Sequence, residues 1–442
     1  MRESGSPTIF ALASGRPAAA IAVIRVSGPD TGAALRALGA SAALRQPRLL
    51  VRVNLRNSAG TVLDDAMAVW FEGPASYTGE DSAEIHCHGG AATIEAVLAA
   101  LGALPGLGMA EPGEFSRRAF DNEKLDLAAV EGLGDLIAAE TEAQRRQALR
   151  QLSGVLGKAC EDWRSRLIGA LAHMEATIDF SDEDLPDTLD DGARAGIAAV
   201  RAEIVEALDD RGVGERLRDG LVVAIVGTPN AGKSSLLNAL AGRDAAIVTD
   251  IAGTTRDVIE VSASLGGYPV SLIDTAGLRD SDDPVEREGI RRARVAAENA
   301  DLRLVVVDGT TWPDIDRETA ALLSAEGAIG VLSKCDLGVR DADDMLPVSA
   351  TTGDGLSDLE AQLAEAAADR LGGSEAVLIT RARHREALSH ASDALTRALD
   401  GRGAELWAED LRYALASLGR VAGRVDVDDV LDVIFRDFCI GK

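Results

Sequence analysis

The sequence predicts a multidomain α/β protein, in which an α/β domain with a mostly parallel sheet interrupts a helical domain that follows an N-terminal α+β domain. Three observations support this fold class. Between residues 217 and 372, short apolar runs alternate with helical patterns, as in a parallel sheet covered by helices. The flanking segments, residues 119–216 and 373–442, carry only helical periodicity. Residues 1–118 are rich in short alternating or β-branched runs.

The composition is that of an ordinary globular protein. Its charge and its apolar stretches indicate which kinds of partner to expect. A chain of 442 residues is too long for one ordinary domain. The formal net charge of −27 argues against a broad, sequence-independent nucleic-acid binder, although it is compatible with a local basic patch. The four cysteines are widely spaced, and no apolar stretch approaches the roughly 20 residues of a membrane span. We therefore predict a cytoplasmic protein without a membrane partner.

The N-terminal domain, residues 1–118, is expected to contain both strands and helices. Expected strands lie in residues 8–14, 19–28, 48–56, 66–73 and 82–90, and expected helices in residues 30–38 and 91–104.

The helical domain is expected in two parts, residues 119–216 and 373–442. Ala, Leu, Glu and Arg recur there at helical spacing, as in long amphipathic helices. The acidic tract at residues 180–193 contains a proline and is predicted to be a loop. The second part is too short for much of a core of its own. We therefore expect one helical domain with the α/β domain, residues 217–372, inserted into it.

Residues 221–238, LVVAIVGTPNAGKSSLLN, carry the strongest functional signal. An apolar strand is followed by Gly227, then by Gly232, Lys233 and Ser234 in the spacing G-x-x-x-x-G-K-S, and then by a helical pattern. Glycines let backbone N–H groups face phosphate oxygens. The lysine adds positive charge at the β and γ phosphates, and the serine offers a hydroxyl to Mg²⁺. The loop predicts binding of a nucleoside triphosphate.

Four further motifs follow in the order that a GTPase requires. The TTRD at residues 254–257 offers a threonine hydroxyl to Mg²⁺, and the DTAG at residues 274–277 offers a carboxylate that can hold Mg²⁺ through water. In the SKCD at residues 333–336, Asp336 can accept both N1–H and the 2-amino group of guanine, an arrangement that adenine lacks. The SA at residues 349–350 can support the base with a backbone amide. We therefore predict a Ras-like P-loop GTPase domain that uses GTP rather than ATP.

One position departs from many switch GTPases. The residue after D-x-x-G is often a glutamine that orients the attacking water, and here it is Leu278. Spacing alone assigns no arginine finger either. Other groups must therefore position the water and neutralise the charge of the transition state.

Over essentially its whole length the sequence resembles the tRNA modification GTPase family MnmE, also called TrmE. Within the GTPase domain the resemblance is carried by residues 227–257 and 274–290. Outside it, the matching stretches are SYTGEDSAEIHCHGG, EPGEFSRRAFDNEKLDLA and the terminal FCIGK, none of which is a general GTPase feature. The resemblance implies an N-terminal folate-binding domain that dimerises, a helical domain, and a GTPase domain inserted into the helical domain.

The resemblance also implies a catalytic arrangement that uses a cation. GTPase domains of this family pair in the presence of K⁺ and use no arginine finger. The positions that match the family's K⁺ ligands are Asn230, Thr249, Ile251 and Thr254. Glu286 matches the glutamate that orients the attacking water, although its position alone favours a solvated acid at a helix start.

The motifs and the resemblance together assign the nucleotide site. The Mg²⁺ ligands are Ser234 and Thr255. The GTP-binding residues are Asn230, Ala231, Gly232, Lys233, Ser234, Ser235, Thr249, Asp250, Ile251, Ala252, Gly253, Thr254, Thr255, Asp274, Thr275, Ala276, Gly277, Ser333, Lys334, Asp336, Ser349, Ala350 and Thr351.

For the N-terminal domain, the resemblance implies a site for 5-formyltetrahydrofolate or a related tetrahydrofolate derivative. Its ligands map to Arg25, Glu84, Lys124 and Lys442. These residue types suit the ligand, because a pterin N–H edge matches a carboxylate and glutamyl carboxylates match cations. Cys439 is a candidate for the one-carbon chemistry or for packing, and the sequence does not choose between the two.

The activity implied by the resemblance is K⁺-dependent GTP hydrolysis within tRNA modification. A homodimer would form a heterotetramer with an FAD-dependent partner resembling MnmG. Together they would place an aminomethyl or carboxymethylaminomethyl group on C5 of the wobble uridine, and GTP hydrolysis would drive opening and closing of paired GTPase domains. One alternative is a ribosome-assembly GTPase, which is expected to carry a second GTPase domain or a basic RNA-binding module. The other is a non-catalytic, nucleotide-gated scaffold, which Leu278 would suit.

One departure from the usual pattern lies in the base-reading motif. This motif is usually N-K-x-D, and here Ser333 replaces the asparagine. The loss of an amide contact to the base or the loop predicts a reduced affinity for guanine nucleotide. Asp336, which determines guanine specificity, is retained.

Overall fold

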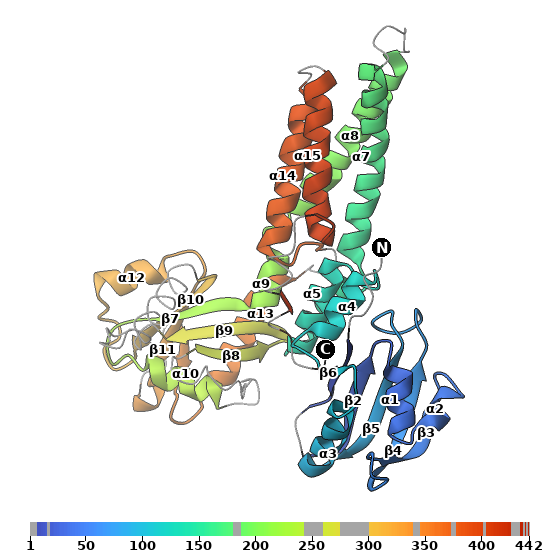
Figure 1. The fold of residues 1–442 in the computed structure, drawn as a ribbon. Helices are drawn as coiled ribbons and strands as arrows, with labels where there is room; N and C mark the ends of the chain where they lie inside the picture. Colours follow the sequence, from blue (N-terminus) through green and yellow to red (C-terminus); the bar gives the residue numbers. More distant parts are fainter. Residues whose placement is uncertain are drawn as a thin grey trace, which may run out of the picture. The chain divides into compact units, whose positions relative to one another are not determined.

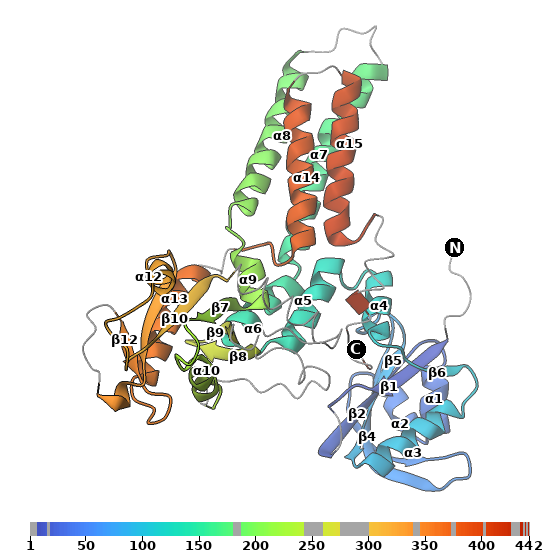
Figure 2. The same cartoon turned by 90° about the vertical axis from the view of Figure 1, so that its left-hand side faces the viewer.

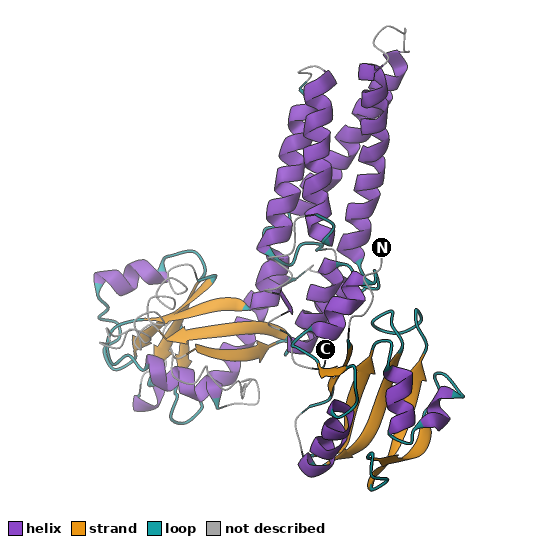
Figure 3. Cartoon of the chain, viewed as in Figure 1, coloured by secondary structure: helices purple, strands orange, loops and turns teal. Residues whose placement is uncertain are grey.

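The structure is a computed structural model of the 442-residue chain. It describes residues 7–15, 18–179, 187–242, 260–274, 300–338, 345–372, 377–400 and 404–425, together with Ile434, Phe435, Phe438 and Gly441. The chain forms two compact units, which contain two separate sheets and many helices (Figure 1, Figure 3). Unit 1 comprises residues 1–134, 152–165 and 415–442, and unit 2 comprises residues 135–151 and 166–414.

The sheet of unit 1 has six strands in the order β3-β4-β5-β2-β1-β6. Neighbouring strands are antiparallel except for β1 and β6, which are parallel. The strands are β1 Thr8–Leu12, β2 Ala19–Ser27, β3 Val51–Arg56, β4 Val62–Phe71, β5 Ser82–Gly89 and β6 Leu107–Met109.

The helices α1 Thr31–Ala37, α2 Ser41–Leu44 and α3 Ala91–Gly102 cover one face of this sheet (Figure 2). Alternation along the strands explains why, since Ile24 and Ile85 point into the core with Leu35 and Val97 of the helices. The opposite face carries Arg25 and Glu84, and it also buries Ile9 and Ala11 of β1 against Phe115. The α+β prediction for this region is confirmed, whereas β6 and α2 were missed because three or four residues show no periodicity.

The helical part of unit 1 contains α4 Glu114–Asp121, most of α5 Leu127–Ala138 and the start of α7 Val155–Asp179. Phe435, near the C-terminus, packs with Leu127 and Val130 of α5. A Cβ at Gly113, the N-cap of α4 (φ 69°), would lie only 2.6 Å from the Phe435 carbonyl oxygen. Phe435 therefore packs closely against the start of α4 and against α5.

Unit 2 contains α6 Glu142–Leu152, α8 Asp187–Leu208, α14 Ala382–Leu399 and the first part of α15 Ala404–Ala422. On α8, Ile197, Val200 and Ile204 are buried at helical spacing, and this stripe faces α14. The hydroxyl of Thr396 on α14 accepts a hydrogen bond from Arg201 Nε at 2.7 Å.

Two predictions for the helical segments need correction. The predicted loop at residues 180–193 is partly wrong, because α8 already begins at Asp187. Acidic residues after a proline are favourable in the first turn of a helix as well as in loops. The long helices expected within residues 119–216 are also interrupted at residues 139–141, because Thr141 and Gln144 form a capping box that starts α6 anew.

The sheet of unit 2 has the order β12-β11-β10-β7-β9-β8, and all neighbours are parallel except β8 and β9. Its strands are β7 Leu221–Val226, β8 Glu260–Leu265, β9 Tyr268–Asp274, β10 Leu302–Asp308, β11 Ala328–Ser333 and β12 Leu346–Val348. The predicted mostly parallel sheet is confirmed. The antiparallel edge strand β8 was not predicted, since its alternating small polar residues give only a weak apolar signal.

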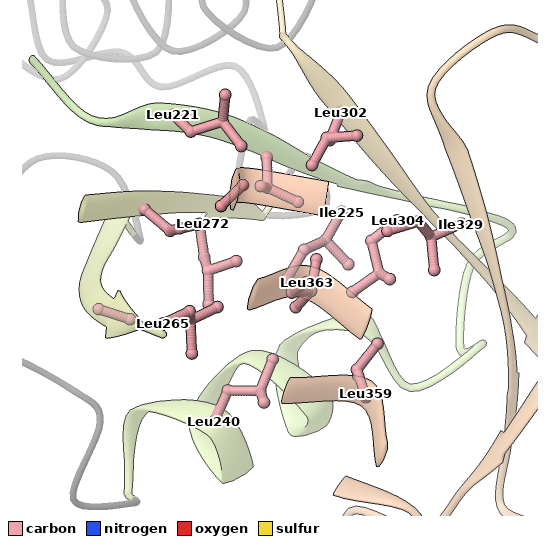
Figure 4. Close-up of a cluster of buried hydrophobic side chains, with 14 of the residues drawn as sticks. Leu221, Ile225, Leu240, Leu265, Leu272, Leu302, Leu304, Ile329, Leu359 and Leu363 are labelled. Atoms are coloured by element: carbon pink, nitrogen blue, oxygen red, sulfur yellow. The ribbon is translucent and has the colours of Figure 1, made fainter. Parts of the chain in front are cut away.

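Helices on this domain are α9 Val213–Asp219, α10 Lys233–Ala241, α12 Arg317–Leu323, α13 Leu356–Leu371 and the 3₁₀ turn η2 Cys335–Leu337. Figure 4 shows the leucine-rich core between the sheet and two of these helices. Ile225 of β7 and Leu304 of β10 meet Leu240 of α10 and Leu363 of α13. This packing fixes the C-terminal ends of the strands, where the nucleotide motifs begin.

No helix within the described part of the chain is both long enough and apolar enough to span a bilayer. The domain boundaries expected at residues 118/119, 216/217 and 372/373 remain predictions.

Candidate functional site

The nucleotide motifs meet at one edge of the unit 2 sheet. Strands β7, β9, β10, β11 and β12 are parallel, so their C-terminal ends share that edge. The phosphate loop follows β7, Asp274 ends β9, Ser333 ends β11, and Ser349 follows β12. Ligands of parallel α/β domains bind at this edge, and β7 lies at the point where the strand order reverses.

The phosphate loop requires glycine where it leaves β7. Gly227 has φ 146°, and a Cβ there would lie 2.2 Å from the Val306 carbonyl oxygen of β10. No side chain fits at that distance. Glycine is also needed at Gly232 (φ 96°), the N-cap of α10, which lets backbone N–H groups turn toward a phosphate.

Lys233 lies folded over its own loop. Its ammonium donates to the carbonyl oxygens of Gly227 and Thr228, both at 2.8 Å. Burial lowers the pKa of Lys233, and the nearby Asp274 carboxylate opposes that shift. The side chain is therefore held where it can exchange carbonyl contacts for phosphate oxygens.

Ser234 and Asp274 are brought together from positions 40 residues apart in the sequence. The Ser234 hydroxyl donates to Asp274 Oδ2, and Asp274 is completely buried. Hydroxyl and carboxylate oxygens are the ligands that Mg²⁺ prefers. The pair was predicted from the motifs, and the structure places its two members in direct contact.

The base-reading segment is tied to the phosphate loop through two consecutive residues. The Ser333 hydroxyl is within hydrogen-bond distance of the Ala231 carbonyl oxygen, and Lys334 Nζ donates to the Asn230 carbonyl oxygen at 2.9 Å. Lys334 Nζ also donates to Asp308 Oδ2 at 2.7 Å. Asp308, at the end of β10, was missed by sequence reasoning. Its position at the C-terminal end of a parallel strand was the available signal.

The remaining described nucleotide residues occupy the same edge. Asp336 lies exposed in η2, directly after Lys334 and Cys335. Ser349 is buried, and its hydroxyl accepts from the backbone N–H of Thr352 at 3.1 Å and, at 3.3 Å, from that of Thr351. This shapes the loop that begins at Ala350. Ser235 is exposed in the first turn of α10.

Several predicted site residues lie outside the described part of the chain. In the GTPase domain these are Thr249, Asp250, Ile251, Ala252, Gly253, Thr254, Thr255, Thr275, Ala276, Gly277 and Glu286. At the C-terminus they are Cys439 and Lys442.

A second polar site lies on the face of the unit 1 sheet that is opposite α1 and α3. Arg25 on β2 pairs with Glu84 on β5 across the strand register, with 3.0 Å between Nη2 and Oε1. The Arg25 guanidinium also lies 5.1 Å from the centroid of the Tyr77 ring and 5.7 Å from that of Phe115. The family resemblance implied Arg25 and Glu84 as ligands of a folate site, which stays a prediction, and sequence reasoning did not name the two rings.

The segment between β4 and β5 that carries Tyr77 is fixed by a buried arginine. Arg118 of α4 donates to Glu80 at 3.1 Å and to Glu114 at 2.8 Å. Asn122 donates to the Thr78 carbonyl oxygen at 2.8 Å. Lys124, which is exposed, has its Cε within 3.4 Å of where a Cβ on Gly79 would stand, so it lies beside this segment.

Gly441 approaches the same strands. A Cβ at Gly441 would lie 2.1 Å from the Leu12 carbonyl oxygen, and β1 pairs with β2 in a register that sets Ala11 opposite Arg25. Tyr77, Phe115 and Gly441, which are distant in sequence, therefore lie in one region of unit 1.

A groove of about 390 Å³ lies on the same face of the sheet. Its lining combines apolar side chains with charged and imidazole groups. The lining residues are Ala20, Ile21, Leu50, Arg52, Asp65, Ala66, Met67, His86, Cys87 and His88. His86 follows Glu84 by two positions on β5 and shares its face, and its Nε2 lies 3.5 Å from Glu84 Oε2, so the groove lies beside the Arg25–Glu84 pair.

The fold of unit 2 and its site define a P-loop GTPase: a mostly parallel sheet, a phosphate loop, a buried Asp–Ser pair and a base-reading segment share one edge. Comparison with known proteins extends this class to the whole chain. The family model for the MnmE helical domain matches residues 127–439, and that for the GTP-binding protein TrmE N-terminus matches residues 8–124. The chain belongs to the MnmE family of tRNA modification GTPases.

Individual relatives match this chain over nearly its full length. The tRNA modification GTPase MnmE of Paramagnetospirillum magneticum is 54% identical, covering 99% of this chain and 100% of that protein. The MnmE of Parvibaculum lavamentivorans is 54% identical, and the match covers 98% of this chain and 100% of that protein. Among solved structures, the G domain of the T. maritima FeoB iron transporter is 28% identical and covers 33% of this chain and 98% of its own, with a TM-score of 0.24.

The family assignment decides between the sequence-based alternatives. This chain is a GTPase that takes part in tRNA modification. The ribosome-assembly reading and the non-catalytic scaffold reading are therefore set aside.

Proposed function

We propose that this protein hydrolyses GTP in a K⁺-dependent reaction and, with a flavin-dependent partner, modifies C5 of the wobble uridine of certain tRNAs. The observation that carries the proposal is the presence in one chain of a GTPase site and of a separate Arg25–Glu84 site, on different sheets. Two sites with different chemistry suit a protein in which GTP hydrolysis drives a conformational cycle while another site handles a one-carbon unit.

K⁺ would replace an arginine finger in the GTPase site. Asn230 would be a cation ligand together with Thr249, Ile251 and Thr254, and Glu286 would orient the attacking water. Asn230 has φ 66°, a left-handed conformation that asparagine tolerates better than most residues. The backbone at this position therefore favours Asn or Gly, and of these two only Asn offers a side-chain oxygen to a cation.

Mg²⁺ fits the oxygen pair of Ser234 and Asp274. The direct contact of hydroxyl and carboxylate supports a site in which Ser234 and Thr255 bind the ion and Asp274 holds one of its waters. When bound, the ion neutralises charge on the β and γ phosphates. The protein's own contribution is to hold Lys233 and the phosphate-loop N–H groups beside the same oxygens.

A tetrahydrofolate derivative such as 5-formyltetrahydrofolate fits the second site. Glu84 would accept from the pterin N–H edge, while Arg25, Lys124 and Lys442 would meet carboxylates. Tyr77, over whose ring the Arg25 guanidinium lies, would present ring surface to a flat ligand, while the completely buried Phe115 would support the guanidinium. The groove that runs on toward His86 and His88 offers further room.

The assembly that we propose is a cytoplasmic homodimer formed through the N-terminal domain. It would bind an FAD-dependent partner resembling MnmG in a heterotetramer, and tRNA would be the common substrate. Cys439 lies outside the described residues and remains a candidate either for the one-carbon chemistry or for packing.

The test is reconstitution with unmodified tRNA, the partner, GTP and a one-carbon-bearing tetrahydrofolate. Mass spectrometry of the wobble nucleoside should detect an aminomethyl-type uridine with the native protein. Both Glu84→Gln and Lys233→Ala should abolish it, while Glu84→Gln should still hydrolyse GTP. Product formation by Glu84→Gln at the native rate would contradict the role of the second site.

A further inference from the structure

One stretch of this acidic chain carries positive charge only. Residues 31–63 contain five arginines but no Asp, Glu or Lys, although the whole chain has 72 acidic and 45 basic residues. Four of these arginines belong to the C-terminal end of α2, the following loop and β3. They are Arg45, Arg48, Arg52 and Arg56, and we call them the β3 patch. In Figure 1, α2 and β3 lie side by side at one edge of unit 1. A local basic surface on an acidic protein favours a partner of negative charge.

The arginines of the β3 patch are exposed and keep most of their hydrogen-bond donors. Within the described part of the chain, Arg52 is the member that pairs with a carboxylate, that of Asp65. Arg56 uses one guanidinium nitrogen on the Gly60 carbonyl oxygen, at 2.9 Å. A guanidinium has five N–H groups, so further donors of Arg56 face solvent. Among the described strands, β3 pairs with β4 alone, and its outer edge stays open to a partner.

Arg48 is held in an unusual conformation. Its φ of 66° lies in the left-handed region, which arginine adopts rarely. Its guanidinium lies 5.7 Å from the centroid of the Phe71 ring and donates to the Ala75 carbonyl oxygen. The ring and the carbonyl fix the guanidinium plane while the residue stays exposed, and such planes stack on unpaired RNA bases. A residue in a strained backbone conformation on an exposed charged surface indicates a functional site.

The chemistry of the β3 patch fits the backbone of RNA. All its cations are arginines, whose planar forked guanidinium binds phosphate with two parallel hydrogen bonds, whereas lysine acts as a point charge. Leu49 and Leu50, which are 51% and 42% exposed, add apolar surface between the charges, against which an unstacked base can pack. The family of this chain acts in tRNA modification, so RNA is the polyanion that its activity requires.

We propose that the β3 patch binds the sugar–phosphate backbone of tRNA and holds the RNA strand beside the Arg25–Glu84 site. Arg52 belongs to the patch and also lines the groove beside that pair, so the two surfaces adjoin. Phosphate contacts position an RNA without reading its sequence. A few such contacts on a protein of net charge −27 give weak binding that depends strongly on salt. The inference rests on the proposed role in tRNA modification and names the surface that this role requires.

The experiment measures the anisotropy of a fluorescently labelled tRNA transcript with uridine at the wobble position, titrated with the full-length protein. Titrations run from about 50 to 200 mM NaCl, a range over which phosphate contacts lose much of their affinity. Two double variants change the patch, Arg45→Gln with Arg56→Gln and Arg45→Lys with Arg56→Lys. The matched control, Arg211→Gln with Arg317→Gln, removes the same two charges from exposed positions of unit 2.

We expect the double Gln variant to bind tRNA at least about tenfold more weakly at the lowest salt, because two phosphate contacts are lost. The slope of log affinity against log salt should fall by about 1.5 to 2. The double Lys variant should keep the native slope and bind with an affinity between those of the native and double Gln proteins. The control should stay within about twofold of the native protein. GTP turnover and 5-formyltetrahydrofolate binding should be unchanged in all three, which separates RNA binding from loss of folding.

Native affinity and native salt slope in the double Gln variant would overturn the proposal. The arginines would then protect the open edge of β3 from pairing with another strand, or bind an acidic protein. An equal loss in the control variant would also overturn it, as would a native protein that binds no tRNA at the lowest salt.

Sedimentation velocity of the RNA-free proteins completes the test, and a loss of tRNA affinity seen only in a self-associated variant would count against the patch. The binding assay contains neither GTP, tetrahydrofolate nor partner. Failure of tRNA modification in the reconstituted system would therefore leave a patch-dependent affinity standing, and failure of the patch would leave the modification result standing.

Discussion

Asp308 illustrates how one side chain at a strand end organises the nucleotide site. Its carboxylate accepts from Lys334 and from the backbone N–H and hydroxyl of Thr310. Burial alone would raise the pKa of Asp308, but the hydrogen bonds from Lys334 and Thr310 outweigh burial and lower it. The carboxylate thus keeps Lys334 extended across the site, where it reaches the phosphate loop.

Replacement of Asp308 by Asn should destabilise the GTPase domain in a pH-dependent way. A lowered folded-state pKa gives stability that is present above the unfolded-state value, about 3.9, and is lost as pH falls through the lower folded-state value. At pH 7 we expect a cost of about 0.5–1 kcal/mol, small because Lys334 is 36% exposed and water screens the pair. The difference from the native protein should shrink below about pH 4.

Scanning calorimetry across this pH range measures the effect of Asp308→Asn. The GTPase transition is identified as the one that GDP shifts to higher temperature. Asp369→Asn, at an exposed position on α13, is the control. A stability difference that stayed constant from pH 7 to pH 3.5 would contradict the ionic account.

At the scale of elements, α4 matters because it fixes the segment between β4 and β5. Arg118 is 8% exposed and holds Glu80 and Glu114 together. It also donates to the Pro7 carbonyl oxygen at 2.9 Å, which attaches the start of β1. The Tyr77 ring is fixed from the same side, since its hydroxyl lies 2.8 Å from the Ser116 hydroxyl of α4.

Replacement of Arg118 by Met should weaken both the N-terminal domain and its ligand binding. Two carboxylates would lose their buried cation, which typically costs about 2–4 kcal/mol. We expect a lower melting temperature and, at temperatures where the variant is folded, at least about tenfold weaker binding of 5-formyltetrahydrofolate in calorimetry. Arg36→Met, at an exposed position on α1, is the control. Native affinity in a folded Arg118→Met protein would show that α4 does not position this site.

Elements with strong periodicity could be predicted from the sequence, and short or capped ones could not. The apolar run of β7 and the alternation of β5 are visible directly. The break before α6 was predictable in principle from the Thr141–Gln144 spacing, but the continuous helical pattern outweighed it.

The residues of the candidate sites also divide into those that the sequence predicts and those that it does not. Lys233, Ser234 and Asp274 are recognised because their motifs are local, and the shared sheet edge brings them together. The pairing of Asp308 with Lys334 spans 26 positions and that of Glu80 with Arg118 spans 38, so no local pattern predicts them.

At the scale of the whole molecule, a small polar network within unit 2 joins the GTPase domain to the helical part. Asp135, at the end of α5, accepts from Arg381 at 2.6 Å and lies 3.4 Å from Arg218 Nε. Arg385 of α14 binds Asp210 and Glu215, which lie before and within α9. The segments where the chain enters and leaves the GTPase domain are therefore joined to each other and to the helical part.

Replacement of Arg385 by Met should loosen this junction. Asp210 is only 7% exposed in its side chain and would be left without its cation, so we expect a loss of about 2–4 kcal/mol. In calorimetry the nucleotide-shifted transition should separate from that of the helical part. Arg317→Met, exposed on α12, should leave the profile unchanged. An unaltered profile in Arg385→Met would mean that the network does not couple the two parts.

The most direct test of the central claim is GTP turnover by the full-length protein in K⁺ and in Na⁺ at equal ionic strength, beside Asn230→Gly. Glycine removes the side-chain amide but tolerates φ 66°, so this variant avoids the strain that alanine would introduce. We predict turnover at least about tenfold faster in K⁺, as expected when a charge-neutralising group enters the transition state, and loss of that advantage in the variant. Equal turnover in the two salts by the native protein would contradict cation-assisted hydrolysis.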